Sequence, residues 1–93
     1  MPTYVMLTNL TAEGVRTLKN NPGRVAEVNN EAEQMGVKVL TQYATLGQFD
    51  FVSVVEAPDE QTMAKVSIEL GSRGTMSSQT LTAIPTDQLA EAL

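Results

Sequence analysis

The chain has 93 residues, of which 42% are hydrophobic, and a formal net charge of −5. This length predicts a single domain, residues 1–93, with one modest hydrophobic core. No apolar run approaches the roughly 18 residues that a membrane-spanning helix needs, and no basic stretch followed by an apolar one opens the chain. We therefore expect no membrane span, no secretory signal and a cytoplasmic location.

The residue types that are missing narrow the chemistry further. The chain has no Cys and no His, which excludes disulfides, Cys- or His-ligated zinc and iron–sulfur sites, and Ser–His or Cys–His catalysis. We expect no cofactor and no metal. The six basic residues are dispersed, so nucleic-acid binding through phosphate neutralisation is not expected either. Any proton transfer would depend on Asp, Glu, Lys or Tyr.

The first half of the chain predicts a strand followed by two helices. Residues from Thr3 to Asn9 are rich in β-branched and aromatic side chains, which is typical of a strand. Thr11 is suited to cap a helix that Gly14 weakens. Asn21, followed by proline, predicts the cap of a second, longer helix. The apolar stripe of that helix recurs at spacings of three and four, at Val25, Val28, Ala32 and Met35.

A glycine-bearing turn joins two further predicted strands. Residues Val37 to Ala44 alternate as in a strand, and Phe51 to Glu56 are nearly all apolar, which predicts a central strand covered on both faces. The two would form a hairpin, with Gly47 as the turn position that takes a positive φ.

The last third predicts a helix, an edge strand and a short terminal helix. Asp59 is suited to cap a helix that reaches Leu70. Its buried positions would be Met63, Val66 and Leu70. Residues Thr75 to Ile84 predict a strand at an edge of the sheet, and Asp87 to Leu93 predict the terminal helix.

The order strand, helix, strand, strand, helix, strand is the split βαβ plan of the ferredoxin-like fold. This α+β fold places helices on one face of a four-stranded antiparallel sheet. We expect the other face to carry Met6 or Tyr4 together with Phe51 or Val52, and we expect a second copy of the chain to cover it. The prediction is a homodimer or a higher homo-oligomer. A register shift of one residue would exchange the two faces.

The segment Leu46–Asp50, taken with Pro2–Thr8 and Leu70–Thr75, resembles the GYD domain family over nearly the whole chain. The resemblance implies the dimeric α+β barrel version of the ferredoxin-like plan, in a small, mostly prokaryotic and functionally uncharacterised family. Gly47 and Asp50 match the family pattern. Phe49 stands where the family has tyrosine, so a role for a phenol oxygen does not carry over.

The same Gly-x-aromatic-Asp pattern also resembles the effector-binding domain of Lrp/AsnC-type regulators. That resemblance implies binding of a small molecule, such as an amino acid, between subunits. Related barrel enzymes often use a catalytic histidine, which this chain lacks.

Arg73, flanked by Gly71 and Gly74, is the best candidate for binding an anion. Glycines let backbone N–H groups converge beside a guanidinium. The alternative interpretation is structural: Arg73 would neutralise the carbonyl end of the preceding helix and pair with Glu69.

Asp50 and Tyr43 are the other candidate ligand-binding residues. The Asp50 carboxylate could bind a ligand amine or act as a general base, or it could accept backbone N–H groups at the turn. Tyr43 offers a phenol, although a tyrosine in a sheet is usually only half-buried. We interpret the acidic residues of the second helix as a solvated face and not as a metal site: Glu27, Glu31 and Glu33.

Three functional hypotheses remain open. The first is a homo-oligomeric domain that binds a small ligand, for which an anion is a candidate, in the cleft between sheet and helices without covalent chemistry. The second is a cofactor-independent enzyme, oxygenase-like or isomerase-like, that uses Asp50 with Tyr43 or Arg73. The third is a structural or interaction module.

Overall fold

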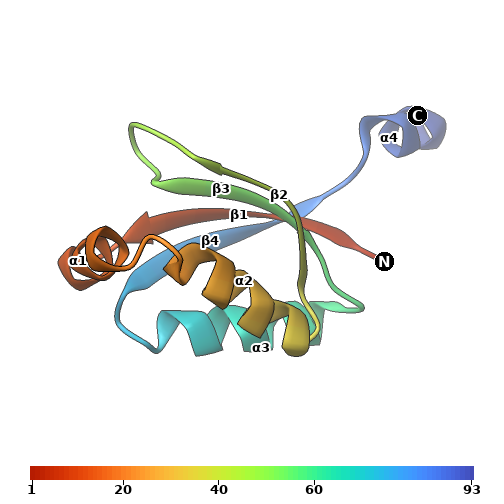
Figure 1. The fold of residues 1–93 in the computed structure, drawn as a ribbon. Coiled ribbons are helices and arrows are strands. Elements are labelled where there is room, and N and C mark those ends of the chain that lie inside the picture. Colours follow the sequence, from red (N-terminus) through yellow and green to blue (C-terminus); the bar gives the residue numbers. More distant parts are fainter.

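A computed structural model describes residues 1–93 as a four-stranded sheet with three helices on one face and a fourth helix at the C-terminal end (Figure 1). The elements in chain order are β1 (Thr3–Leu10), α1 (Ala12–Asn20), α2 (Arg24–Gln34), β2 (Lys38–Ala44), β3 (Phe51–Glu56), α3 (Glu60–Gly71), β4 (Met76–Ala83) and α4 (Thr86–Ala92). None of these helices has the length and apolarity needed to cross a bilayer.

The sheet is antiparallel throughout, and its strand order is β2-β3-β1-β4. This is the order of a ferredoxin-like plait, so the predicted fold class is confirmed. β1 pairs with both β3 and β4 along its length. The two outer strands, β2 and β4, are the edges, as expected for the strand that ends near Ile84.

The helix-covered face of the sheet holds the core. Alternate residues of β1, namely Tyr4, Met6 and Thr8, point toward the helices and are buried. α2 packs on β2, and α3 packs on β4. The buried hydrophobic residues form one cluster: Tyr4, Met6, Ala32, Val37, Val55, Ala57, Met63, Val66 and Leu70.

No helix covers the opposite face of the sheet in Figure 1. Cross-strand neighbours gather five apolar side chains there, and we call this surface the open face: Val5, Leu7, Val52, Val54 and Leu81. Val52 was expected on this face, but Tyr4, Met6 and Phe51 were placed on it wrongly. Both alternating sets of β1 include apolar residues, so hydrophobicity alone could not distinguish the two faces.

Two further predictions about the sheet are corrected. β3 is central, but only its helix side is covered by the chain. In β2 the alternation is broken by a bulge at Leu40, because Val39 pairs with Val55 while Thr41 already pairs with Val54. Val39 and Gln42 therefore face the helices.

Two helix caps are confirmed, and a third prediction is wrong. The Thr11 hydroxyl accepts the Gly14 N–H at 3.1 Å, and the Asp59 carboxylate accepts the Thr62 N–H at 2.8 Å. α2 begins two residues later than expected. Its N-cap is Gly23, without a side-chain cap, since the residues after Asn21 form a separate turn, closed by an Arg24 N–H bond to the Asn21 carbonyl at 3.0 Å.

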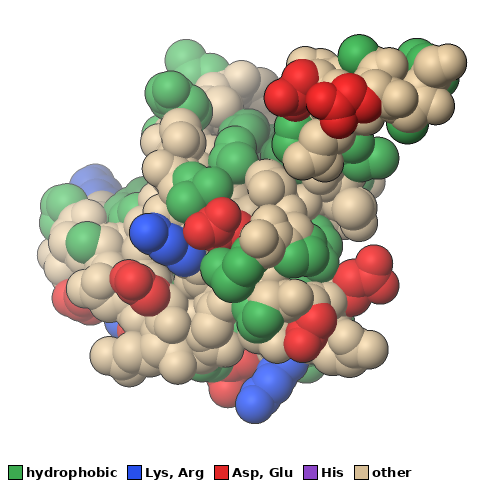
Figure 2. Space-filling view, turned by 90° about the vertical axis from the view of Figure 1, so that its right-hand side faces the viewer, with side chains coloured by type: hydrophobic (Ala, Val, Ile, Leu, Met, Phe, Trp, Pro, Cys, Tyr) green, Lys and Arg blue, Asp and Glu red, His purple; other side chains and the backbone are tan.

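The predicted terminal helix is present as α4, and it lies away from the body of the molecule. All seven of its residues are exposed. Figure 2 shows it as a separate projection that carries acidic side chains. α4 therefore adds nothing to the core of a single subunit.

Candidate functional site

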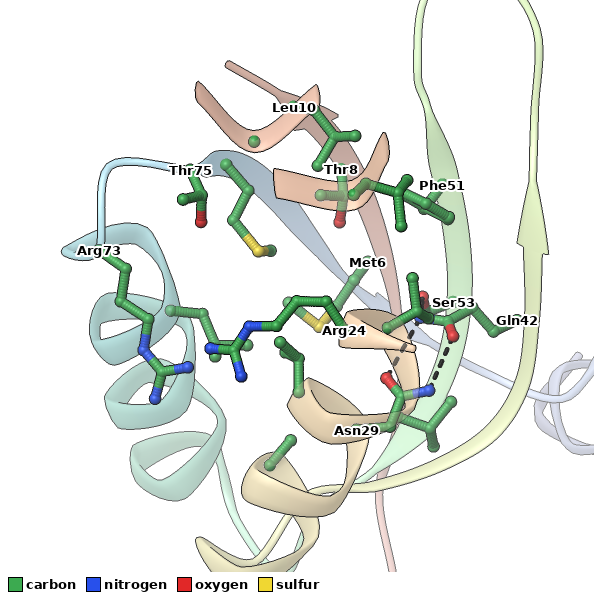
Figure 3. A pocket seen from close by; sticks show the side chains of 18 of the residues that line it. Met6, Thr8, Leu10, Arg24, Asn29, Gln42, Phe51, Ser53, Arg73 and Thr75 are labelled. Atoms are coloured by element: carbon green, nitrogen blue, oxygen red, sulfur yellow. Dashed lines mark hydrogen bonds between the residues drawn. The ribbon is translucent and has the colours of Figure 1, made fainter. Parts of the chain in front are cut away.

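A cavity of about 160 Å³ lies between the sheet and the helices (Figure 3). It forms because α2 covers one side of the sheet face and α3 the other. Between them, β1 and β3 present small side chains, Thr8 and Ser53, and α2 presents Ala32. These side chains are too short to close the space between the two helices.

The wall of the cavity is mainly apolar: 13 of its 22 lining residues are hydrophobic. Such a wall favours a ligand with a hydrocarbon body and a small number of polar groups. The hydrophobic side chains come from both layers and include Met6, Val28, Phe51, Val66 and Met76.

A hydrogen-bonded trio of polar side chains lies on one side of the cavity. The Asn29 amide donates to the Gln42 carbonyl oxygen at 2.8 Å, and the Gln42 amide donates to the Ser53 hydroxyl at 3.0 Å. The trio joins α2, β2 and β3, as Figure 3 shows. Because its members bond to one another, the trio orders this wall without needing a ligand.

Two arginines lie on the other side of the cavity in Figure 3, and one carboxylate joins them. Glu31 accepts from Arg24 Nη1 at 3.0 Å and from Arg73 Nη1 at 2.6 Å. Each arginine also has a partner of its own, Glu27 at 3.2 Å and Glu69 at 3.4 Å respectively. This ionic group holds the end of α3 against α2.

Glu31 and Arg73 are both charged at neutral pH. The hydrogen bond from Arg73 lowers the pKa of Glu31 below the ordinary range of a glutamate, against the opposing effect of desolvation. The same bond raises the pKa of Arg73. Glu31 is therefore an anion held between two cations, and its side chain, 35% exposed, lies at the margin of the predicted solvated face of α2.

The family of the chain is settled by comparison with known proteins. The model of the GYD domain matches residues 4–93. The chain belongs to the GYD domain family. The resemblance inferred from residues 46–50 and the two flanking segments is thereby confirmed.

One GYD domain relative aligns with this chain along its full length. A protein from Thermus thermophilus is 49% identical over 94 residues, which cover 100% of this chain and 99% of the relative. Its name is "Glutamine synthetase and cystathionine beta-lyase binding protein".

The three expected ligand residues of this GYD domain do not converge. Arg73 lines the cavity. Tyr43 pairs with Val52 on the open side of the sheet and is 64% exposed, so Tyr43 and Arg73 lie on opposite sides of the sheet. The Asp50 carboxylate accepts the Leu10 N–H at 2.8 Å, which ties the turn to the end of β1.

Gly47 of the predicted turn and the two glycines that flank Arg73 have different backbone conformations. Gly47 and Gly74 have φ values of 116° and 78°, in the left-handed region. Gly71 is instead the last residue of α3 and does not have a positive φ.

The remaining phenol of the GYD domain is unsuited to act as a base. Burial raises the pKa of Tyr4, and Glu60 and Asp59 raise it further. The Tyr4 hydroxyl therefore stays protonated at neutral pH. No group of three or more acidic side chains lies close enough together to hold a metal ion.

Four residues that form the polar trio and the ion pairs of the cavity were not predicted from the sequence as site residues: Arg24, Asn29, Gln42 and Ser53. Two of them had a visible signal. Asn29 follows Val25 by four residues and so lies on the apolar stripe of its helix, and Ser53 interrupts an otherwise apolar strand. A polar side chain at such a position is buried on folding and needs partners. Arg24 and Gln42 had no comparable signal.

Proposed function

We propose that the chain is a homo-oligomeric binding protein whose partner is a metabolic enzyme, and that it works without covalent chemistry. The observation that carries this proposal is the full-length relative at 49% identity that is named for binding glutamine synthetase and cystathionine beta-lyase. Because only 12 of the 93 residues are buried, 49% identity must include positions outside the core. The expected cytoplasmic location stays part of the proposal.

The open face supports self-association within this proposal. Val5, Leu7, Val52 and Val54 are only half-buried in a single subunit, and Leu81 is 41% exposed. A contiguous apolar surface is commonly covered by a second copy through a two-fold axis. The helix layer would then remain available for the enzyme.

A direct binding measurement tests the enzyme proposal. The purified chain would be immobilised and exposed to glutamine synthetase and to cystathionine beta-lyase from its own host, with an unrelated enzyme of similar size as control. We expect saturable binding of at least one of the two named enzymes. Absence of binding to both at about 10 μM, where transient interfaces are still detected, would contradict the proposal.

The cavity favours a second candidate function, binding of a small ligand. Its apolar wall lies next to two guanidinium groups, those of Arg24 and Arg73. A thermal-shift screen of metabolites tests this candidate, because a ligand at a hundredfold excess over its Kd stabilises the folded state by about 2.7 kcal/mol. A screen in which no compound raises Tm would remove the candidate.

The geometry offers no support for an enzyme built on Asp50 with Tyr43 or Arg73. Of these three residues only Arg73 lines the cavity, and the Asp50 carboxylate accepts a backbone N–H. A general base must reach its substrate together with its partner group. We therefore do not extend the proposal to catalysis.

A further inference from the structure

We propose that the cavity binds a small monocarboxylate with an apolar body, and that Arg73 and Arg24 hold the carboxylate. This inference rests on the proposed small-ligand function and names the ligand class and the residues that select it. It is independent of the proposed enzyme partner.

The size of the cavity limits the body of the ligand. A cavity of about 160 Å³ is close to the ~150 Å³ apolar cavity that accommodates a benzene molecule. A ring or a chain of about six carbons therefore fits. An apolar group of that size would make van der Waals contacts with the mainly apolar wall.

The charges on the wall determine the polar end of the ligand. Arg24 and Arg73 are the only charged residues among the 22 that line the cavity. Their carboxylate partners do not line the cavity: Glu27, Glu31 and Glu69. A ligand in the cavity therefore contacts two cations on its wall, while the three carboxylates paired with those cations lie behind them and give the whole ionic group a net charge of −1. Charge-assisted hydrogen bonds from guanidinium to carboxylate are the contacts that this arrangement favours.

Both guanidinium groups retain donors for a ligand. Arg24 uses only Nη1 in its two ion pairs, and Arg73 uses Nη1 and Nε. A guanidinium has five N–H groups in a planar fork, so the Nη2 groups of both side chains remain. The side chains of Arg24 and Arg73 are 35% and 28% exposed, so both guanidinium groups are partly buried but remain subject to screening by solvent and salt.

Glu31 sets the strength of the anion site. It is the carboxylate that both arginines already bind, so it competes with a ligand carboxylate and repels it at short range. A ligand with one negative charge meets less of this repulsion than a dianion such as a phosphate ester. Replacing Glu31 by its neutral isostere should therefore tighten binding, whereas a purely structural ion pair predicts no gain.

Calorimetric titration of the full chain tests the ligand class. The probes are hexanoate and phenylacetate, each compared with its neutral amide, hexanamide and phenylacetamide. We expect the carboxylates to bind about tenfold or more tightly than the amides, as the loss of a charged hydrogen bond predicts. Equal affinity of acid and amide would overturn the proposed carboxylate recognition but leave small-ligand binding intact. Absence of binding by all four probes would overturn the proposed ligand class, while the metabolite screen tests small-ligand binding separately.

Three variants, each checked for native circular dichroism, assign the site to these residues. Arg73→Gln should weaken binding of hexanoate by about tenfold or more. Glu31→Gln should strengthen it severalfold. The matched control is Arg16→Gln on α1, because Arg16 is exposed and outside the cavity wall, and it should leave the affinity unchanged. Unchanged affinity in Arg73→Gln, or weaker binding in Glu31→Gln, would contradict the proposed role of the arginines. If Arg73→Gln does not fold, the comparison of acid and amide probes on the parent protein still tests carboxylate recognition.

Discussion

Gly14 lowers the intrinsic stability of α1, but the packing of α1 against the rest of the fold requires it. Considered within α1 alone, a glycine costs stability and alanine would be preferred. In the folded chain, a Cβ at this position would lie 2.0 Å from the Thr75 carbonyl oxygen. The close approach of α1 to the residue before β4 therefore requires glycine. Nothing near Gly14 in the sequence indicates that contact, because Thr75 is far along the chain.

Substituting two glycines by alanine tests this requirement. Gly14→Ala should lower Tm, because a backbone oxygen cannot move aside as a flexible side chain could. Gly71→Ala is the matched control: it also lies in a helix, has no atom within 4 Å of the added Cβ, and does not have a positive φ. We expect Gly71→Ala to be neutral or to stabilise by about 0.4–1 kcal/mol. Thermal denaturation followed by circular dichroism measures both, and equal Tm values for the two variants would argue against the close contact.

Glu31 makes the stability of the fold depend on pH on the acid side. Its pKa is lower in the folded state than in the unfolded state, since Arg73 stabilises the charged form. The stabilisation is fully present above the unfolded pKa, about 4.3, and is lost as pH falls through the folded pKa. Asp59, whose pKa is also lowered, by its hydrogen bond to the Thr62 N–H, adds to the same trend.

Tm measured in a series of buffers between about pH 6 and pH 3 tests this dependence. The parent should lose stability over the acid part of the range. Glu31→Gln should show a flatter profile, because it has no carboxylate to protonate, with the residual slope due to Asp59. Parallel profiles for parent and variant would mean that the ion pairs of Glu31 do not contribute to folding.

At the scale of elements, the sequence predicted where strands and helices lie more accurately than how they face one another. The helix pattern identified Met63, Val66 and Leu70 as the buried side of α3, and the structure confirms all three. It was harder to predict which side chains of β1 and β2 face the helices. Apolar residues occur on both sides of β1, and a bulge at Leu40 reverses the alternation of β2. A bulge depends on the partner strand and leaves no local signal.

The candidate site could likewise be predicted only where its contacts are between residues close in the sequence. Arg73 was recognised from its flanking glycines and from Glu69 one turn earlier. Its shortest ion pair is with Glu31, 42 positions away in the chain, and that pair brings Arg24 to the same place. Only the packing of α2 and α3 on one sheet face assembles this group.

Thr11 connects the start of α1 to the segment that precedes β4. Its hydroxyl accepts the Gly14 N–H at 3.1 Å and donates to the Gly74 carbonyl at 2.8 Å. Thr11→Val keeps the shape and removes both bonds, so we expect a loss of about 1–2 kcal/mol in the free energy of unfolding. Thr11→Ser keeps the hydroxyl and should retain most of the stability. Chemical denaturation measures the difference, and similar losses in both variants would show that the methyl group matters more than the hydroxyl.

For the whole molecule, the proposed self-association uses the open face. Leu7 lies on that face next to Val52 on the neighbouring strand. Leu7→Glu places a charge where the proposed dimer would exclude water, which is strongly unfavourable. We expect the variant to be monomeric with native circular dichroism, while Leu46→Glu, at a fully exposed loop residue, should leave the assembly of the parent unchanged. Light scattering after size exclusion measures the mass, and a Leu7→Glu protein with the mass of the parent assembly would exclude this face as the contact.

The Glu31–Arg73 pair also makes the junction of α2 and α3 sensitive to dissolved electrolyte. Mobile ions weaken attraction between partly exposed charges, and the Debye length falls from about 10 Å at 0.1 M to about 3 Å at 1 M. In concentrated brine the two helices should separate more readily, and apolar molecules should enter and leave the space beneath them faster. The ionic strength of the medium would thus regulate the exchange rate of the proposed cavity ligand.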